Sequence, residues 1–185
     1  MVKQKSEVIV ENQAAARKYV VLGLVFPLVI AFDQWTKQLI HTRLNLHESL
    51  PVIDGWFNIT YVRNTGAAFG MLANADPAFR VPFFILVPLL ALVSIAWLFK
   101  KLPAKDLQMA FALALVLSGA IGNLIDRLVY GYVIDFLSFY NHSLGQFPAF
   151  NVADSAITVG VALLMLDMLR NPNALENTAS KQKQP

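Results

Sequence analysis

The sequence predicts a membrane α-helical protein: a four-transmembrane-helix bundle with a strand in an extracytoplasmic loop and both termini in the cytoplasm. Hydrophobic residues make up 56% of the chain and charged residues only 15%, whereas a soluble domain carries about 25% charged residues. Mean hydropathy is +0.51. The apolar residues fall into four long runs, and the basic residues cluster near the ends of these runs. There is no cysteine, which excludes disulfides and thiol nucleophiles.

The first apolar segment is too short to cross a membrane on its own. Its uncharged run, Tyr19–Phe32, covers only about 21 Å of a ~30 Å hydrocarbon core at ~1.5 Å per residue. The helix must therefore continue through Asp33 and Lys37, giving a span at about residues 19–38. A cleaved signal peptide is the alternative interpretation, but no small-x-small cleavage site follows the run and three more spans do.

The second and third spans are expected at about residues 80–99 and 107–128, because each contains a long uncharged run and a short basic loop lies between the two. The third ends in a polar helix face, because Gly119, Gly122, Asn123 and Asp126 recur at helical spacing. Glycines on such a face let a neighbouring helix approach closely, while the asparagine and aspartate supply polar contacts.

The fourth span, at about residues 152–169, is again short. Its uncharged part, Ser155–Leu166, covers about 18 Å, so Asp154 or Asp167 must lie near or within the membrane. The four spans form one membrane domain over residues 19–170. We expect a disordered basic tail over residues 1–18 and a polar tail over residues 171–185, both cytoplasmic.

Two long loops connect the first span to the second and the third span to the fourth. In the first loop, Trp56–Val62 is aromatic and β-branched, which predicts a strand. The small residues of Asn64–Gly70 then suggest either close approach to another backbone or an ordinary turn. In the second loop, Gly131 ends the helix, Tyr132–Leu137 is extended, and Asn141–Gln146 is expected to be a flexible tip.

Basic residues predict the orientation. The side that holds both tails and the loop between the second and third spans carries ten Lys and Arg, and the other side carries five. The positive-inside rule then places both termini in the cytoplasm and both long loops outside. Asp33, Asn123, Asp126, Asn151 and Asp154 thereby lie at the outer ends of their spans, and Asp135 lies in the second outer loop.

Ionisable groups at membrane depth are costly and each one suggests a functional site. Asp135 stands between Ile134 and Phe136, which favours a raised pKa because the carboxylate is poorly solvated there. Two carboxylates held close together cannot both ionise cheaply, so one keeps its proton and the pair offers an acid and a base. Asp135 and Asp154 are our candidates for this pair, and peptide hydrolysis without a covalent intermediate is the reaction that fits.

Other chemistries are less consistent with the sequence. A serine hydrolase would need a base near Ser118 or Ser155, and a Ser–Lys dyad would need Lys37 beside a serine. The histidines lack zinc-site spacing, so no metal and no cofactor is expected, and no nucleic acid is expected as a partner. The aspartates could also be only helix caps and interhelical pairs. A proton-coupled transporter or channel subunit is the alternative function, although no inverted repeat is visible.

The chain resembles bacterial lipoprotein signal peptidase, or signal peptidase II, a membrane aspartyl endopeptidase family. Five blocks in the family's order carry the resemblance: Asp33–Lys37, Asn64–Phe69, Gly119–Arg127, Val133–Phe136 and Phe150–Asp154.

The resemblance implies that the substrate is a prolipoprotein whose cysteine already carries diacylglycerol, and that cleavage occurs just before this cysteine. It implies a multi-pass enzyme of the bacterial inner membrane, in contact with membrane lipids, inhibited by globomycin-type peptides and with its active site facing the periplasm or cell exterior. It also implies a small extracytoplasmic β-strand cradle, formed on the membrane surface by the strands of the first loop. Nothing in the sequence demands an oligomer, so we expect a monomer. Asp135 and Asp154 would be the catalytic dyad. The residues that would bind substrate or support the dyad are Asp33, Lys37, Asn64, Gly66, Gly119, Asn123, Asp126, Arg127 and Asn151. We also expect Gly119 and Gly122 to leave an apolar gap for the lipid chains.

Overall fold

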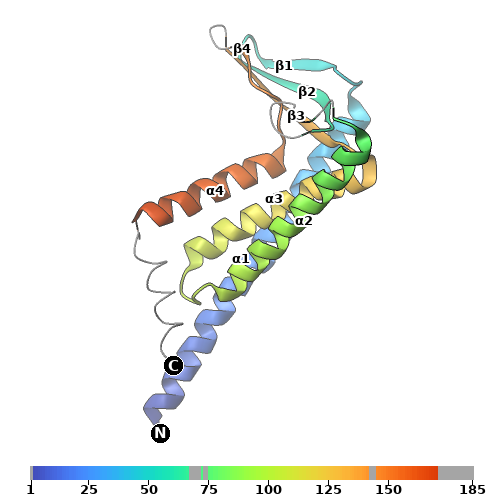
Figure 1. Ribbon diagram of the computed structural model, residues 1–185. Coiled ribbons are helices and arrows are strands. Elements are labelled where there is room, and N and C mark those ends of the chain that lie inside the picture. Colours follow the sequence, from blue (N-terminus) through green and yellow to red (C-terminus); the bar gives the residue numbers. More distant parts are fainter. Residues whose placement is uncertain (1, 67–71, 73–74, 142–144, 171–185) are drawn as a thin grey trace.

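The computed structural model describes residues 2–66, 72, 75–141 and 145–170. Its elements, in chain order, are α1 (Val2–Arg43), β1 (Ser49–Ile53), β2 (Phe57–Asn64), α2 (Pro77–Lys101), α3 (Leu107–Tyr130), β3 (Val133–Asn141), β4 (Gly145–Gln146) and α4 (Val152–Arg170). Figure 1 shows the four helices running together, with the sheet at the end remote from the N-terminus.

The helices confirm the predicted class of fold. Within the described residues, four helices are long and apolar enough to cross a membrane, and the part of α1 that qualifies is Ala16–Arg43. α1 itself begins at Val2, so it is helical where the sequence predicted a disordered tail. Its 42 residues extend to about 63 Å at ~1.5 Å per residue, well beyond a ~30 Å hydrocarbon core. The predicted tail over residues 171–185 lies outside the described residues.

The sheet joins the two long loops. Its strand order is β1-β2-β3-β4, all pairs are antiparallel, and β2 from the first loop pairs with β3 from the second. Both extended segments predicted from the sequence are therefore strands. The register opposes Val62 to Asp135 and Asn64 to Val133, which brings the end of β2 beside Asp135. Of the predicted flexible tip, residues 142–144 lie outside the described part of the chain, while Gly145–Gln146 forms β4.

Local signals in the sequence define where α2 and α3 begin and where α3 ends. The Asp76 side chain accepts a hydrogen bond from the Ala78 amide, and the Asp106 side chain accepts one from Met109, so both aspartates cap the first turn of a helix. Gly131 ends α3 with φ of 79°, a left-handed conformation that glycine adopts without steric cost.

Lys18, in the N-terminal half of α1, joins this helix to the C-terminus of α2. Its side chain is buried, and its ammonium donates to the main-chain carbonyls of Phe99, Lys100 and Leu102 at 3.2, 3.2 and 2.7 Å. These carbonyls lie at the C-terminus of α2, where the helix dipole favours a cation. A residue that the sequence assigned to a tail therefore stabilises a helix end.

α3 is the central helix, and small residues allow α4 to pack tightly against it. A Cβ at Gly119 would overlap the carbonyl of Ala153 and lie 2.8 Å from Ile157, and a Cβ at Gly160 of α4 would lie 2.7 Å from the carbonyl of Ala112. Glycine is required at both positions because the two backbones approach so closely.

The expectation that Gly119 and Gly122 leave an apolar gap for lipid chains is wrong. α4 occupies the space over Gly119, and a Cβ at Gly122 would lie 2.6 Å from a carboxylate oxygen of Asp33 and 3.3 Å from the Ala153 side chain. These glycines bring helices together instead of leaving room for lipid.

Gly119→Ala is expected to lower the stability of the protein, because the added methyl group pushes α3 and α4 apart at a point where backbone is the obstacle. Overpacking of this kind costs about 1–3 kcal/mol. Thermal unfolding in detergent would measure it, with Gly23→Ala as the matched control, since a Cβ at Gly23 meets nothing within 4 Å. Equal melting temperatures for the two variants would contradict the close packing.

Candidate active site

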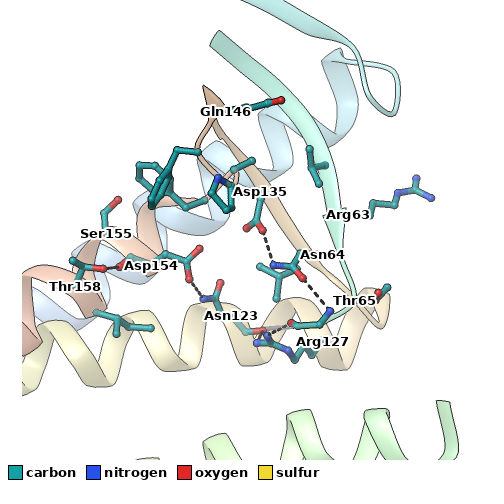
Figure 2. Close-up of a pocket in the computed structure, with 18 of the residues that line it drawn as sticks. Arg63, Asn64, Thr65, Asn123, Arg127, Asp135, Gln146, Asp154, Ser155 and Thr158 are labelled. Atoms are coloured by element: carbon teal, nitrogen blue, oxygen red, sulfur yellow. Dashed lines mark hydrogen bonds between the residues drawn. The ribbon is translucent and has the colours of Figure 1, made fainter. Parts of the chain in front are cut away.

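A cavity of about 940 Å³ lies between the sheet, the start of α4 and the sheet-side end of α3. Figure 2 shows side chains from all three sources facing it. Six of the residues singled out from the sequence line this cavity: Asn64, Gly66, Asn123, Arg127, Asp135 and Asp154. Five others do not line it: Asp33, Lys37, Gly119, Asp126 and Asn151.

Asp135 and Asp154 come from two different elements, β3 and the first turn of α4, and both line the cavity. Asp135 is 1% exposed. Burial, and next the negative charge of Asp154, raise its pKa to about 7. The expectation of a raised pKa at Asp135 is confirmed, and its direct neighbours Ile134 and Phe136 are buried as the sequence suggested.

Asn151 connects the two carboxylates. Its side-chain nitrogen donates to Asp135 Oδ1 at 2.8 Å, and its main-chain N–H donates to Asp154 Oδ2 at 3.2 Å. Its side-chain oxygen accepts from the Asp154 N–H at 2.9 Å. The pair Asn151 and Asp154 thus forms a reciprocal capping box at the start of α4, with an aspartate in the place of the usual glutamate. This cap fixes Asp154 against the same asparagine that holds Asp135.

A buried cation lies behind the cavity. The Lys37 ammonium contacts Asp33 Oδ2 at 2.8 Å, Asp126 Oδ2 at 3.1 Å and Asn123 Oδ1 at 2.9 Å, and its side chain is almost completely buried. Asn123 in turn donates to Asp154 Oδ1 at 2.7 Å. The Asn123 amide therefore connects the buried lysine to a carboxylate in the cavity, since it accepts from Lys37 and donates to Asp154.

Asp33 and Asp126 are fully buried; they accept hydrogen bonds from main-chain N–H groups and do not line the cavity. Asp33 Oδ1 accepts from the Ala153 N–H at 2.8 Å, and Asp126 Oδ2 accepts from the Ile134 N–H at 3.0 Å. For these two residues the structural interpretation, as cap and interhelical pair, describes the observed contacts. Asp126 forms its ion pair with Lys37, whereas Arg127 donates to the main-chain carbonyls of Asn123 and Gly66.

The opposite wall of the cavity holds Asn64, Gly66 and Arg127. Asn64 donates to Asp135 Oδ2 at 3.0 Å and accepts from the Gly66 N–H at 3.0 Å. Arg127 lies over the ring of Phe84 and donates to the carbonyls of Gly66 and Asn123, both at 3.3 Å. The rest of the small-residue segment, residues 67–70, lies outside the described part of the chain.

The contacts leave the other chemistries without a site. The hydroxyls of Ser118 and Ser155 donate to carbonyls of their own helices, and Lys37 contacts carboxylates and an amide instead of a serine. Among the described residues, no three His, Asp or Glu side chains are grouped so that they could hold a metal ion.

Sequence reasoning missed part of the cavity wall and one buried amide. The missed wall residues are Val62, Arg63, Thr65, Val133, Gln146, Phe147, Pro148, Ala149, Phe150, Ser155, Ile157, Thr158 and Val159. The apolar segment that leads into Asn151 was a signal for several of them. Gln34, which contacts Asp33 and Asp126, was also missed, although an amide beside a membrane aspartate was visible in the sequence.

Comparison with known proteins gives one consistent answer. The family model described as signal peptidase (SPase) II matches residues 25–170. The lipoprotein signal peptidase of Geobacter sulfurreducens is 57% identical over 141 residues, which is 76% of this chain and 86% of that protein. That of Syntrophus aciditrophicus is 52% identical over 145 residues, 77% of this chain and 88% of that protein. A solved bacterial membrane enzyme superposes with a TM-score of 0.74 at 35% identity, covering 89% of this chain and 93% of its own.

The four long apolar helices define a multi-pass membrane protein, and its cavity holds two acids, the buried Asp135 and the half-buried Asp154. The chain belongs to the signal peptidase II family, and it is an aspartyl endopeptidase of the lipoprotein signal peptidase type in the bacterial inner membrane. The alternative function as a transporter or channel subunit has no support.

Lys37→Met is expected to destabilise the protein strongly, because it removes the cation from two buried carboxylates. Breaking a buried ion pair by deleting one partner costs about 3–5 kcal/mol. Thermal unfolding in detergent would show the loss. Lys101→Met serves as control because Lys101 is an exposed lysine at the end of α2, where it contacts the Trp97 ring and, among the described residues, no buried carboxylate. A Lys37→Met protein as stable as the control would show that the ion pairs of Lys37 with Asp33 and Asp126 do not contribute to stability.

Proposed function

We propose that this chain cleaves prolipoproteins whose cysteine carries diacylglycerol, cutting just before that cysteine, with Asp135 and Asp154 as the catalytic dyad. One observation carries the proposal: two carboxylates from different elements, β3 and α4, line one cavity and are held by the same asparagine, Asn151. The matching relatives are named lipoprotein signal peptidases, which supports a lipoprotein precursor as substrate.

The mechanism uses one shared proton. In the proposed reaction Asp154 is ionised and accepts a proton from water as the oxygen attacks the scissile carbonyl carbon. We assign Asp135 as the protonated partner: its pKa of about 7 leaves roughly half of this carboxyl protonated at neutral pH, and it gives that proton to the carbonyl oxygen. The tetrahedral intermediate then loses the amine of the lipidated cysteine, which takes up the proton held by Asp154, and the carbonyl re-forms as the oxygen returns its proton to Asp135.

Asparagines keep this acid and base in place. Asn64 and Asn151 donate to Asp135, while Asn123 and the Asn151 main chain donate to Asp154, so hydrogen bonds restrain both carboxylates. Arg127 and Gly66 form the wall where we place the peptide. Asp33, Lys37, Gly119 and Asp126 act from behind the cavity and hold the elements that carry the dyad.

The apolar part of the cavity suits the lipid. Phe147, Phe150, Ile157 and Val159 line it beside the dyad, and acyl chains that remain in the membrane can lie along the α4 residues. An inhibitor of the globomycin type would compete for the same cavity. All the groups proposed for catalysis come from one chain, so a monomer suffices. The distribution of basic residues supports placing both termini in the cytoplasm and the cavity toward the periplasm or cell exterior.

Asp135→Asn and Asp154→Asn are each expected to abolish cleavage, since a carboxamide can neither release nor accept the required proton. General acid–base catalysis contributes about 10²–10⁴-fold, so the rate should fall at least 10²-fold. Purified protein in detergent, a diacylated precursor and a gel shift would measure it. Asp167→Asn is the control, because Asp167 lies on α4 but does not line the cavity. Normal cleavage by either dyad variant would reject the assignment.

The cleavage rate is expected to fall as the pH rises through about 7, where Asp135 loses its proton. Asn64→Ala removes an amide that stabilises the ionised form of Asp135, so the pKa rises further and the falling limb moves to higher pH. The pH dependence of kcat/KM for wild type and Asn64→Ala would show the shift, with Asn58→Ala on the same strand as control. A limb that stays in place or moves to lower pH would contradict the role of Asn64.

A further inference from the structure

Gln34 binds both of the buried carboxylates that lie behind the cavity. Its side-chain nitrogen is 3.1 Å from Asp33 Oδ2, 3.0 Å from Asp126 Oδ1 and 3.1 Å from the carbonyl oxygen of Gly122. All three neighbours are acceptors, so the amide nitrogen, and not the amide oxygen, must face them. Gln34 is absent from the residues that line the cavity, so it does not contact a substrate there.

The two carboxylates hold equivalent points next to the dyad. Asp33 accepts from the N–H of Ala153, the residue immediately before Asp154. Asp126 accepts from the N–H of Ile134, the residue immediately before Asp135. The distance between Asp33 and Asp126 therefore influences the distance between the two catalytic carboxyls, because each buried aspartate binds the main chain one residue before a dyad aspartate.

One ammonium cannot fix this separation alone. Lys37 contacts Asp33, Asp126 and Asn123, so its three N–H groups are fully used and none is left for a further oxygen of either carboxylate. Gln34 adds two neutral N–H groups, which are shared among three acceptors. These are Asp33 Oδ2, the same oxygen that Lys37 contacts, Asp126 Oδ1, and the Gly122 carbonyl. A second cation at this position would change the charge of the site, whereas an amide bridges the carboxylates without doing so.

We propose that Gln34 is a positioning residue for the peptidase reaction: by bridging Asp33 and Asp126 it sets the distance between Asp135 and Asp154. The proposal rests on the dyad assigned above. It requires that loss of the bridge slows the chemical step while substrate binding is kept, because the cavity wall is unchanged. Misplacement of reacting groups by about 1 Å costs up to ~10²-fold in rate.

Gln34→Met removes the donors and keeps the size of the side chain. The matched control is Gln38→Met, one turn further along α1, where the glutamine accepts from Tyr130 at an exposed position. Steady-state cleavage of a diacylated precursor should show kcat of Gln34→Met lowered roughly 10-fold to 100-fold, with KM within about twofold of wild type. Gln38→Met should match wild type in both constants.

Gln34→Glu separates bridging from simple space filling. The new carboxyl would face Asp33 and Lys37 on α1, Asp126 on α3 and, across Asn123, Asp154 on α4. When ionised it repels both carboxylates, and when protonated it can again donate one hydrogen bond. Its activity relative to wild type should therefore be low at neutral pH and rise at least severalfold as the pH falls, whereas the ratio for Gln34→Met should stay constant.

The outcomes are distinguishable from failure of the dyad itself. If wild-type protein does not cleave the precursor, or Asp135→Asn still cleaves it, the proposed function fails. If wild type cleaves, Asp135→Asn does not, and Gln34→Met retains wild-type kcat, the positioning role is overturned. A Gln34→Met variant that loses activity only through a raised KM, or only through a lowered melting temperature, also overturns it.

Discussion

The structure depends on one buried charge, the ammonium of Lys37. A cation at membrane depth is stable only when acceptors compensate for its lost solvation. Here the acceptors are Asp33 on the same helix and Asp126 and Asn123 on α3. These contacts bind α1 to α3 near the sheet-side end of the membrane domain. Each partner of Lys37 then contacts something else that belongs to the site, so the ion cluster is also the foundation of the cavity.

The buried acids and the cavity acids differ in their surroundings. Asp33 and Asp126 have a cation and main-chain donors, and they have no access to the cavity. Asp135 and Asp154 have amide donors and face the cavity without a direct cationic partner among the described contacts. The four aspartates thus divide into two with a structural role and two that we propose to be catalytic. The two structural aspartates are the ones that form an ion pair with Lys37.

Close packing brings these groups within hydrogen-bond distance. Gly119 and Gly160 let α3 and α4 approach until backbone atoms limit the distance, so Ala153 and Asp154 lie against the polar face of α3. The pairing of β2 with β3 supplies the other half, because its register brings Asn64 to Asp135. The capping box of Asn151 and Asp154 joins the two halves, and a helix cap therefore also sets the geometry of the acid pair.

The sequence by itself determined the class of fold, the four spans, the two central strands and the family, because hydropathy, strand patterning and the motif blocks are local properties of the chain. It also indicated that Asp135 would have a raised pKa, since its neighbours are apolar. Only the tertiary structure decided which acids share the cavity, that Lys37 serves Asp33 and Asp126 instead of a serine, and that Gly119 faces α4 instead of lipid. Those outcomes depend on which helix faces meet and how closely they pack. Gln34, for example, acquires its role only when Asp126, about 90 residues away, is placed beside it, and the Ile134 N–H likewise depends on Asp126, 8 residues away.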